Sequence, residues 1–195
     1  MNIDILVNKE NKLDEYFIPN DMVKIYEPTS EKLDKTYVNM LVKEAYIAFK
    51  YMQNDALKHG YNIFIDSSYR SYKYQKEIFD DYLNKMGKEY TLSHVAFPGT
   101  SEHQTGLAID IEYMKNNEFV NCKDEDDEIK WLKSNSYKYG YILRYPLGKE
   151  YITGYNYERW HYRYVGLNIA KYLFENRLTL EEYTNEKLLK LLQHK

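Results

Sequence analysis

The 195-residue chain has a single cysteine, no long apolar run and no excess of positive charge. Cys122 cannot form a disulfide within the chain, which fits a reducing compartment. No stretch approaches the roughly 20 apolar residues of a membrane span. Lys and Arg number 27 against 30 Asp and Glu, so the net charge is −3. We therefore expect no nucleic-acid partner, because nucleic-acid-binding proteins usually carry a basic face.

The first residues also lack a secretory signal. Residues 1–8 have neither a basic segment nor an apolar run of signal-peptide length. We therefore expect a cytoplasmic protein, or an extracytoplasmic one if a leader was removed from this sequence.

The bulk composition is that of one ordinary globular domain. Hydrophobic residues make up 44% and charged residues 29% of the chain, which is long enough to bury a real core. No repeat, low-complexity tract or linker divides it, so we predict a single domain over 1–195. That domain would comprise an N-terminal extension and helix over 1–60, a core over about 60–166 and C-terminal helices over 167–195. The sequence does not indicate an oligomeric state.

Hydrophobic periodicity in the first half predicts two strands and two helices. These are a short edge strand at residues 3–7, a helix from about 34 to 58, a strand over 61–67 and a helix from about 71 to 86. Ser71 is suited to cap the second helix at its N-terminus. Residues 89–105 show little hydrophobic periodicity.

The second half predicts more elements of both kinds. They are a strand over 106–113, a helix over 129–139, a strand at 140–146, a short strand or turn at 151–154, a last central strand over 160–165, and helices near 167–176 and 180–193. The acidic run 123–128 is interpreted as the solvated N-terminus of a helix, whose dipole favours negative charge. Thr179 followed by Glu182 is a capping-box pattern at the start of the last helix.

Two separated segments carry candidate metal ligands. Residues 101–110 read Ser-Glu-His-Gln-Thr-Gly-Leu-Ala-Ile-Asp and place His103 seven residues before Asp110, while His161 closes the segment Glu-Arg-Trp-His. Two imidazoles and one carboxylate are the three-protein-ligand set of a catalytic zinc, whose fourth position is left for water. Strand alternation turns Asp110 away from the core, and the small Ala108 beside it is expected to leave room for a metal and its substrate. The other histidines, at 59, 94 and 194, show no partner pattern.

Residues near these ligands could complete a hydrolytic site. Glu158 is placed where a general base is wanted, although alone it would pass for a surface glutamate. Strict alternation puts it and His161 on opposite strand faces, so we predict a backbone irregularity between them. Arg70, at a strand-to-helix junction, could stabilise an oxyanion, and Ser101 could donate to a substrate carboxylate. Trp160 is by default a core aromatic, but in such a site it becomes a candidate for substrate binding.

The two segments resemble the D-alanyl-D-alanine carboxypeptidases of the VanY type and the related VanXY dipeptidase/carboxypeptidases of vancomycin resistance, within the superfamily that includes hedgehog signalling domains. Residues 101–110 match the motif Ser-x-His-x-x-Gly-x-Ala-x-Asp, and 158–166 match Glu-x-Trp-His-x-Arg-Tyr-Val-Gly. Residues 140–146, 152–154 and the Tyr-Arg pair at 69–70 followed by Gln75 are also similar to the family. The likeness covers roughly residues 60–185.

The resemblance implies an α+β fold, in which a small, mainly antiparallel sheet bears one zinc ion and helices pack on its outer face. It implies that His103, Asp110 and His161 are the zinc ligands, Glu158 the general base and Arg70 the oxyanion stabiliser. Gln75 and Ser101 would hold the terminal D-residue. The implied substrate is a peptidoglycan stem peptide or its precursor, from which the C-terminal D-alanine is removed.

One departure from the VanXY pattern bears on specificity. VanXY-type enzymes that cleave the free dipeptide have an acidic residue three positions before the arginine. Here that position is Ser67, and Asp66 is expected on the opposite strand face. We therefore expect a D,D-carboxypeptidase rather than a dipeptidase.

The alternatives that stay open are an L,D-carboxypeptidase on tetrapeptides and a bifunctional D,D-dipeptidase/carboxypeptidase. Less favoured are a phage endolysin that cuts L-alanyl-D-glutamate bonds and a non-catalytic zinc-binding interaction module. The terminal residue accepted (D-alanine, D-serine or D-lactate) and a role in resistance or in wall turnover stay open as well.

Overall fold

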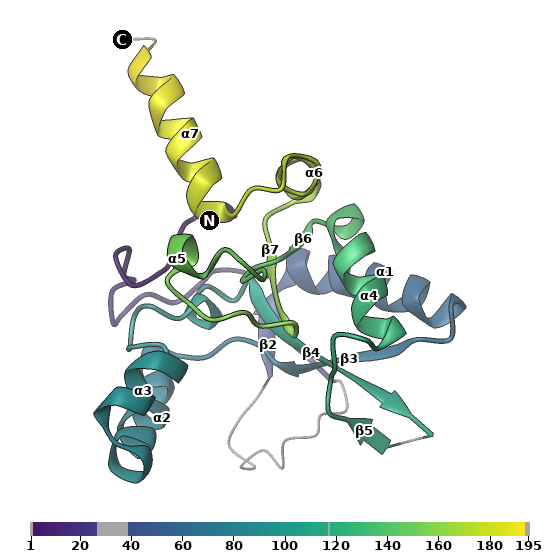
Figure 1. Ribbon diagram of the computed structural model, residues 1–195, viewed down its shortest axis with the longest axis horizontal. Helices are drawn as coiled ribbons and strands as arrows, with labels where there is room; N and C mark the ends of the chain where they lie inside the picture. Colours follow the sequence, from purple (N-terminus) through teal and green to yellow (C-terminus); the bar gives the residue numbers. More distant parts are fainter. Residues whose placement is uncertain (1, 27–38, 117, 194–195) are drawn as a thin grey trace.

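A mainly antiparallel sheet occupies the centre of the structure (Figure 1). The computed structural model describes residues 2–26, 39–116 and 118–193. The hydrogen-bonded strand order is β3-β4-β7-β6, and β5 also pairs with β4. These strands span Asn62–Ser67 (β3), Ala108–Lys115 (β4), Glu118–Val120 (β5), Tyr141–Leu143 (β6) and His161–Tyr164 (β7).

Helices pack around this sheet, in the α+β architecture that the resemblance implied. α1 (Lys43–Lys58) and α4 (Asp127–Asn135) lie together on one side of β3 and β4, whereas α2 (Tyr72–Met86) and α3 (Lys88–His94) form a separate pair (Figure 1). The other elements are β1 (Met22–Lys24), β2 (Met40–Val42), η1 (Glu102–Thr105), η2 (Ser136–Tyr139), α5 (Glu150–Thr153), α6 (Leu167–Asn176) and α7 (Leu180–Gln193).

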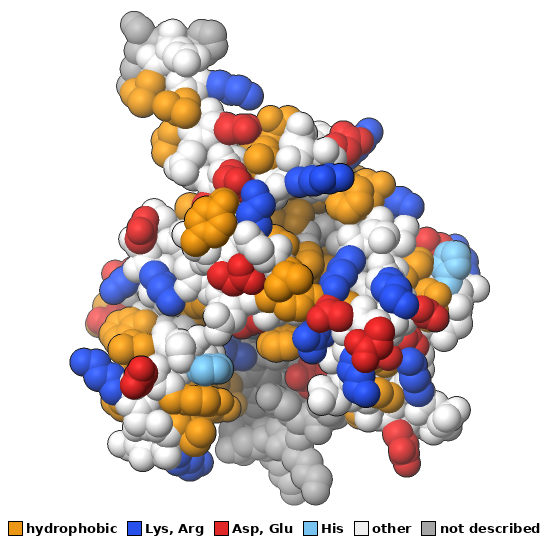
Figure 2. Space-filling view, in the orientation of Figure 1, with side chains coloured by type: hydrophobic (Ala, Val, Ile, Leu, Met, Phe, Trp, Pro, Cys, Tyr) orange, Lys and Arg blue, Asp and Glu red, His pale blue; other side chains and the backbone are white. Residues whose placement is uncertain are grey.

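The C-terminal helix α7 projects away from the rest of the molecule (Figure 1). Figure 2 shows hydrophobic side chains on its projecting end, which carries the exposed residues Leu188, Leu189, Leu191 and Leu192. No helix among the described residues has both the length and the apolar character needed to cross a membrane.

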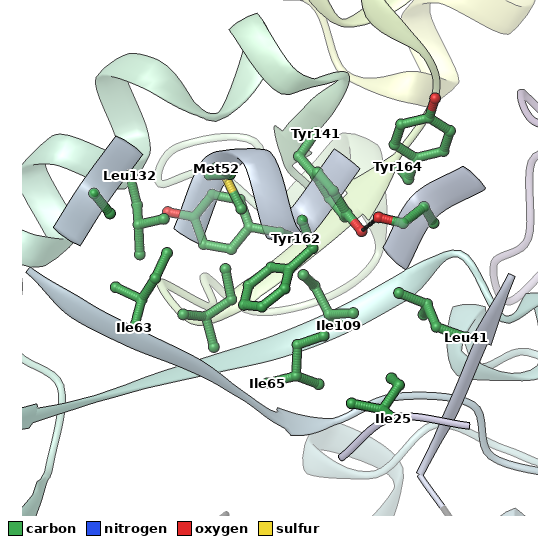
Figure 3. Packing of buried hydrophobic residues seen from close by; sticks show 14 of the residues in the cluster. Ile25, Leu41, Met52, Ile63, Ile65, Ile109, Leu132, Tyr141, Tyr162 and Tyr164 are labelled. Carbon is green, nitrogen blue, oxygen red and sulfur yellow. Dashed lines mark hydrogen bonds between the residues drawn. The ribbon is translucent and has the colours of Figure 1, made fainter. Parts of the chain in front are cut away.

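The core lies between one face of the sheet and α1. The buried residues of α1 are Ala45, Phe49, Met52 and Ala56, which share one helix face because they recur at steps of three and four. Figure 3 shows Ile65 and Ile109 pointing from the sheet toward Met52. Since side chains alternate along a strand, the other face of β4 is left for Asp110 and the polar site.

Most of the predicted elements are confirmed. Ser71 caps α2, its hydroxyl accepting from the backbone N–H of Tyr74 at 3.1 Å. The two C-terminal helices have the predicted bounds. The capping box of α7 is formed in both directions, with the Thr179 N–H donating to Glu182 at 2.7 Å and the Glu182 N–H donating to Thr179 Oγ1 at 3.2 Å.

Three element predictions were wrong, and the helix α3 was missed. Residues 3–7 form no strand, because the carbonyls of Ile3 and Ile5 accept hydrogen bonds from a side chain, that of Arg163. The helix expected from 34 begins at Lys43, because β2 pairs with β1 instead; residues 34–38 lie outside the described ranges. α3 was missed, since its seven residues bury only Thr91. The short strand or turn at 151–154 is the single-turn helix α5.

Gly106 joins η1 to β4 and has to be glycine for two reasons. Its φ of 63° is left-handed, a conformation that residues with a Cβ rarely adopt. A Cβ at this position would also lie 3.1 Å from Pro19 Cγ and 3.3 Å from Val42 Cγ2. The glycine therefore allows the close turn that leads from His103 on η1 to Asp110 on β4.

Candidate metal centre

The structure brings His103, Asp110 and His161 together. The β4–β7 register pairs Asp110 directly with His161, and η1 supplies His103. One possible ligand atom from each residue lies within 4.8 Å of the others. The Asp110 carboxylate is 3.2 Å from His103 Nε2 and 2.8 Å from His161 Nδ1.

Surrounding groups orient the two imidazoles. The far nitrogen of His103, Nδ1, is 2.6 Å from the carbonyl oxygen of Ser68, so it carries the proton and leaves Nε2 free to face Asp110. The ring of His161 stacks on Tyr145 with centroids 5.0 Å apart. Two nitrogens and one carboxylate, preoriented and close together, fit the ligand preferences of zinc.

The electrostatics of the three side chains also suit a cation. Burial lowers the pKa of His103 and, together with the charge of Arg70, outweighs the opposing charge of Asp110, so this ring is neutral as a ligand must be. Burial also lowers the pKa of His161, but the carboxylates of Asp110 and Glu102 outweigh that effect and raise it to about 10. The negative charge around His161 therefore stabilises a positive charge at this position.

Glu158 reaches the same centre because the backbone turns before β7. Arg159 and Trp160 form that turn, and the His161 N–H is 3.4 Å from the Glu158 carbonyl oxygen. The predicted irregularity is thus confirmed. The Glu158 carboxylate lies 3.8 Å from His161 Nδ1. Burial, supported by the nearby charge of Asp110, raises the pKa of Glu158 to about 7, against the opposing charges of His161 and Arg70.

Arg70 is held at the edge of the centre by both halves of its guanidinium group. Nη1 donates to Gln75 Oε1 at 2.9 Å and Nη2 donates to Ser67 Oγ at 3.1 Å. Gln75 is anchored in turn, because its Nε2 donates to the Ala96 carbonyl at 2.8 Å. Gln75 and Ser67 therefore hold the guanidinium group of Arg70 in place.

Asp66, which was predicted to lie on the strand face opposite Ser67, stands where the β3–β4 pairing is irregular. The β3–β4 register pairs Ile65 with Ile111 and then Ser67 with Asp110, so Asp66 is an extra residue in a β-bulge. The bulge interrupts the alternation on which the prediction depended. Asp66 lines a hollow of about 290 Å³ that Asp110 also lines.

A cavity of about 450 Å³ opens over the metal centre. All of the predicted site residues except Ser67 line it: Arg70, Gln75, Ser101, His103, Asp110, Glu158, Trp160 and His161. Trp160 is 38% exposed, so it is no core aromatic. Ala108 is fully buried opposite Arg163 and is not among the lining residues, so the expectation that it makes room for the metal was wrong.

Sequence reasoning missed the charged residues behind His161. Glu102, Arg144 and Arg163 are all buried. Burial raises the pKa of Glu102, but the positive charges of Arg144 and Arg163 outweigh it and hold that pKa below its ordinary value. A signal was present in the sequence, because Arg144 directly follows the hydrophobic segment 141–143 and Arg163 stands between two tyrosines, and buried arginines are paired.

Known proteins are similar to this chain in sequence and in fold. The family model described as VanY, D-alanyl-D-alanine carboxypeptidase, matches residues 38–167. The Bacillus subtilis (strain 168) protein YodJ, provisionally named a carboxypeptidase, is 45% identical over 185 residues, which cover 93% of this chain and 67% of YodJ. A D-alanyl-D-alanine carboxypeptidase of Enterococcus faecalis (strain ATCC 700802 / V583) is 41% identical over 130 residues. That match covers 62% of this chain and 47% of the enterococcal protein, so the chain spans less than half of it.

Two solved structures are similar over most of the chain. The LD-carboxypeptidase LdcB is 43% identical with a TM-score of 0.83, over 92% of this chain and 84% of LdcB. A mutant of the D,D-pentapeptidase VanY from a VanB-type resistance cassette, in complex with Zn(II), is 30% identical with a TM-score of 0.76. That match covers 94% of this chain and 99% of the VanY chain.

Proposed function

Because this chain belongs to the VanY family of D-alanyl-D-alanine carboxypeptidases, we propose that it is a zinc-dependent carboxypeptidase. It removes the C-terminal D-alanine from peptidoglycan stem peptides or their precursors. The observation that carries this proposal is the convergence of His103, Asp110 and His161 in one cavity with Glu158 and Arg70. A non-catalytic zinc module has no need of the last two residues.

The three converging side chains would hold the zinc ion, which lowers the pKa of a bound water to about 7 and polarises a carbonyl oxygen. Glu158 takes a proton from the attacking water and passes it to the leaving amine. Its pKa of about 7 in the metal-free protein falls when a cation is bound beside it, so the carboxylate is ready to act as a base at neutral pH.

Arg70 stabilises the oxyanion of the tetrahedral intermediate. Its guanidinium is permanently charged and is fixed before the substrate arrives by Ser67 and Gln75. Ser101, which is buried and lines the cavity, donates to the carboxylate of the terminal D-residue. Trp160 supplies an apolar wall beside the same residue, since it is partly exposed and lines the cavity.

The sequence-based expectation is D,D-specificity, with cleavage of pentapeptide stems. A second candidate is L,D-specificity, with cleavage of tetrapeptide stems, because the chain is 43% identical to LdcB and 30% identical to the D,D-pentapeptidase VanY. Both activities release a C-terminal D-alanine and use the same metal centre. They differ in the configuration of the residue before the cleaved bond.

Mass spectrometry of three substrates tests the proposal. The zinc-loaded chain is incubated separately with a pentapeptide stem, a tetrapeptide stem and free D-alanyl-D-alanine. Loss of one D-alanine from the pentapeptide alone establishes D,D-specificity, and loss from the tetrapeptide alone establishes the second candidate. Rapid cleavage of the free dipeptide would favour the bifunctional D,D-dipeptidase/carboxypeptidase and overturn the specificity inferred from Ser67. Release from none of the three overturns the proposed function.

A further inference from the structure

Four charged side chains form a buried cluster behind His161: Glu102, Arg144, Arg163 and Glu181, none more than 6% exposed. Glu102 Oε1 accepts from Arg144 Nε and from Arg163 Nη1, both at 2.8 Å. Glu181 accepts from Arg144 at 2.9 and 2.6 Å. Two positive and two negative side chains thus neutralise one another, as burial of charge requires.

This arrangement occupies only one of the two oxygens of Glu102. The other, Oε2, is buried without a hydrogen-bond partner and lies 3.6 Å from His161 Nε2. That nitrogen is also buried without a partner. An acceptor and a potential donor therefore face each other, and a small movement of either would join them.

The side of His161 that faces Glu102 decides which nitrogen can bind a metal. Nδ1 faces Asp110 at 2.8 Å and is the nitrogen available to the metal centre. A ligating nitrogen must carry no proton, so in the neutral ring the proton has to be on Nε2. An ionised carboxylate can only accept a hydrogen bond, so one at Nε2 selects that tautomer. His103 has the reverse arrangement, with the Ser68 carbonyl at its Nδ1.

We propose that Glu102 is a positioning residue of the metal centre. Its Oε2 accepts a hydrogen bond from His161 Nε2 and holds the ring with Nδ1 toward the metal, while Arg144 and Arg163 fix the carboxylate through Oε1. Tyr145, stacked on the ring of His161, restricts the remaining rotation. The inference rests on the proposed function only in that the centre binds a metal.

The tautomer can be measured in the unmodified protein. Long-range proton–nitrogen NMR correlations of the zinc-loaded chain, labelled with nitrogen-15 histidine, should show His161 with its proton on Nε2 and its metal on Nδ1. Contact with the Tyr145 ring identifies the His161 signals. A metal-bound Nε2 in His161 overturns the proposal, whether or not any variant folds.

A pair of variants separates positioning from general stability. In Glu102→Gln the arginines keep the amide oxygen as their acceptor, so the amide nitrogen faces His161 Nε2. That nitrogen is a hydrogen-bond donor, so it disfavours the tautomer that carries its proton on Nε2. Zinc affinity, measured by competition with a chelator, should fall about 10- to 100-fold, the usual effect of changing an outer partner of a ligand. Glu181→Gln removes the same amount of charge from the cluster without facing His161, so its zinc affinity should stay at the wild-type value.

Each outcome of this comparison supports or overturns the proposal. Equal losses of zinc affinity in the two variants would assign the effect to folding, and wild-type affinity in Glu102→Gln would remove the role of the carboxylate. Both results are independent of peptide cleavage. A chain that shows the expected tautomer and affinities but releases no D-alanine contradicts the proposed function alone.

Discussion

Asp110 Oδ1 lies 2.8 Å from Nδ1 of His161, although the two residues are 51 positions apart in the sequence. The β4–β7 register places them directly opposite each other, so the sheet itself sets their separation. A shift of one residue in this register would turn one of them into the core. The buried neighbours Ile109 and Tyr162, which pair next to them, fix the register and hence the metal centre.

Glu158→Gln should abolish most of the peptidase activity without removing the metal. The amide cannot accept the proton of the attacking water, and general acid–base catalysis typically contributes about 10²- to 10⁴-fold. Release of D-alanine should fall by this factor, while the zinc content of the purified protein equals that of the wild type. Wild-type cleavage by this variant would rule out Glu158 as the base.

Arg70→Lys should lower kcat with little change in zinc content. Lysine keeps the charge but cannot make the two fixed contacts with Ser67 and Gln75. Loss of an oxyanion donor typically costs about 10²- to 10³-fold in kcat. The matched control is Lys73→Arg, an exchange at an exposed position of α2, which should leave the kinetics unchanged. An unaltered kcat in Arg70→Lys would contradict the assigned role.

Glu181→Ala should destabilise the fold by about 3–5 kcal/mol, because it leaves Arg144 buried with half of its partners. Urea unfolding followed by circular dichroism measures the change. Glu186→Ala, on the same helix but bonded to an exposed tyrosine, should change the free energy of unfolding by less than about 0.5 kcal/mol. Equal effects of the two substitutions would show that α7 is not anchored through Arg144.

Cys122 should react slowly with iodoacetamide in the folded chain at pH 8. Burial raises the pKa of its thiol to about 12, so almost no thiolate is present, whereas an unfolded cysteine has a pKa of about 8.5. The thiol stays protonated to a higher pH in the folded state than in the unfolded state. This group therefore lowers the free energy of unfolding by about 1.4 kcal/mol per pH unit as the pH rises from roughly 9 toward 12. Equal labelling rates with and without urea would contradict this picture.

The sequence contained enough to predict which three residues converge at the candidate metal centre. His103 and Asp110 lie within one short motif, and the alternation of Leu107, Ile109 and Ile111 already turned Asp110 to the polar face. The turn before His161 could be inferred because a regular strand would have separated that residue from Glu158. The spacing of His103 and Asp110 and the turn before His161 are local, so a pattern of neighbouring residues is sufficient to specify them.

Features that depend on distant pairings could not be predicted. The bulge at Asp66 exists only in the register of β3 against β4, and Met40–Val42 is a strand only because β1 lies beside it. Glu102 was taken as an unremarkable neighbour of His103, because its partners Arg144 and Arg163 lie 42 and 61 residues further along the chain. Ala108 was misread for the same reason, since it is fully buried where β4 pairs with β7, opposite Arg163.

Diffraction at the zinc absorption edge, from crystals grown with zinc, locates the bound metal. One anomalous peak is expected about 2.0–2.2 Å from His103 Nε2, an Asp110 carboxylate oxygen and His161 Nδ1. A crystal in which zinc is bound elsewhere, or in which these three atoms surround no anomalous peak, would contradict the proposed metal centre.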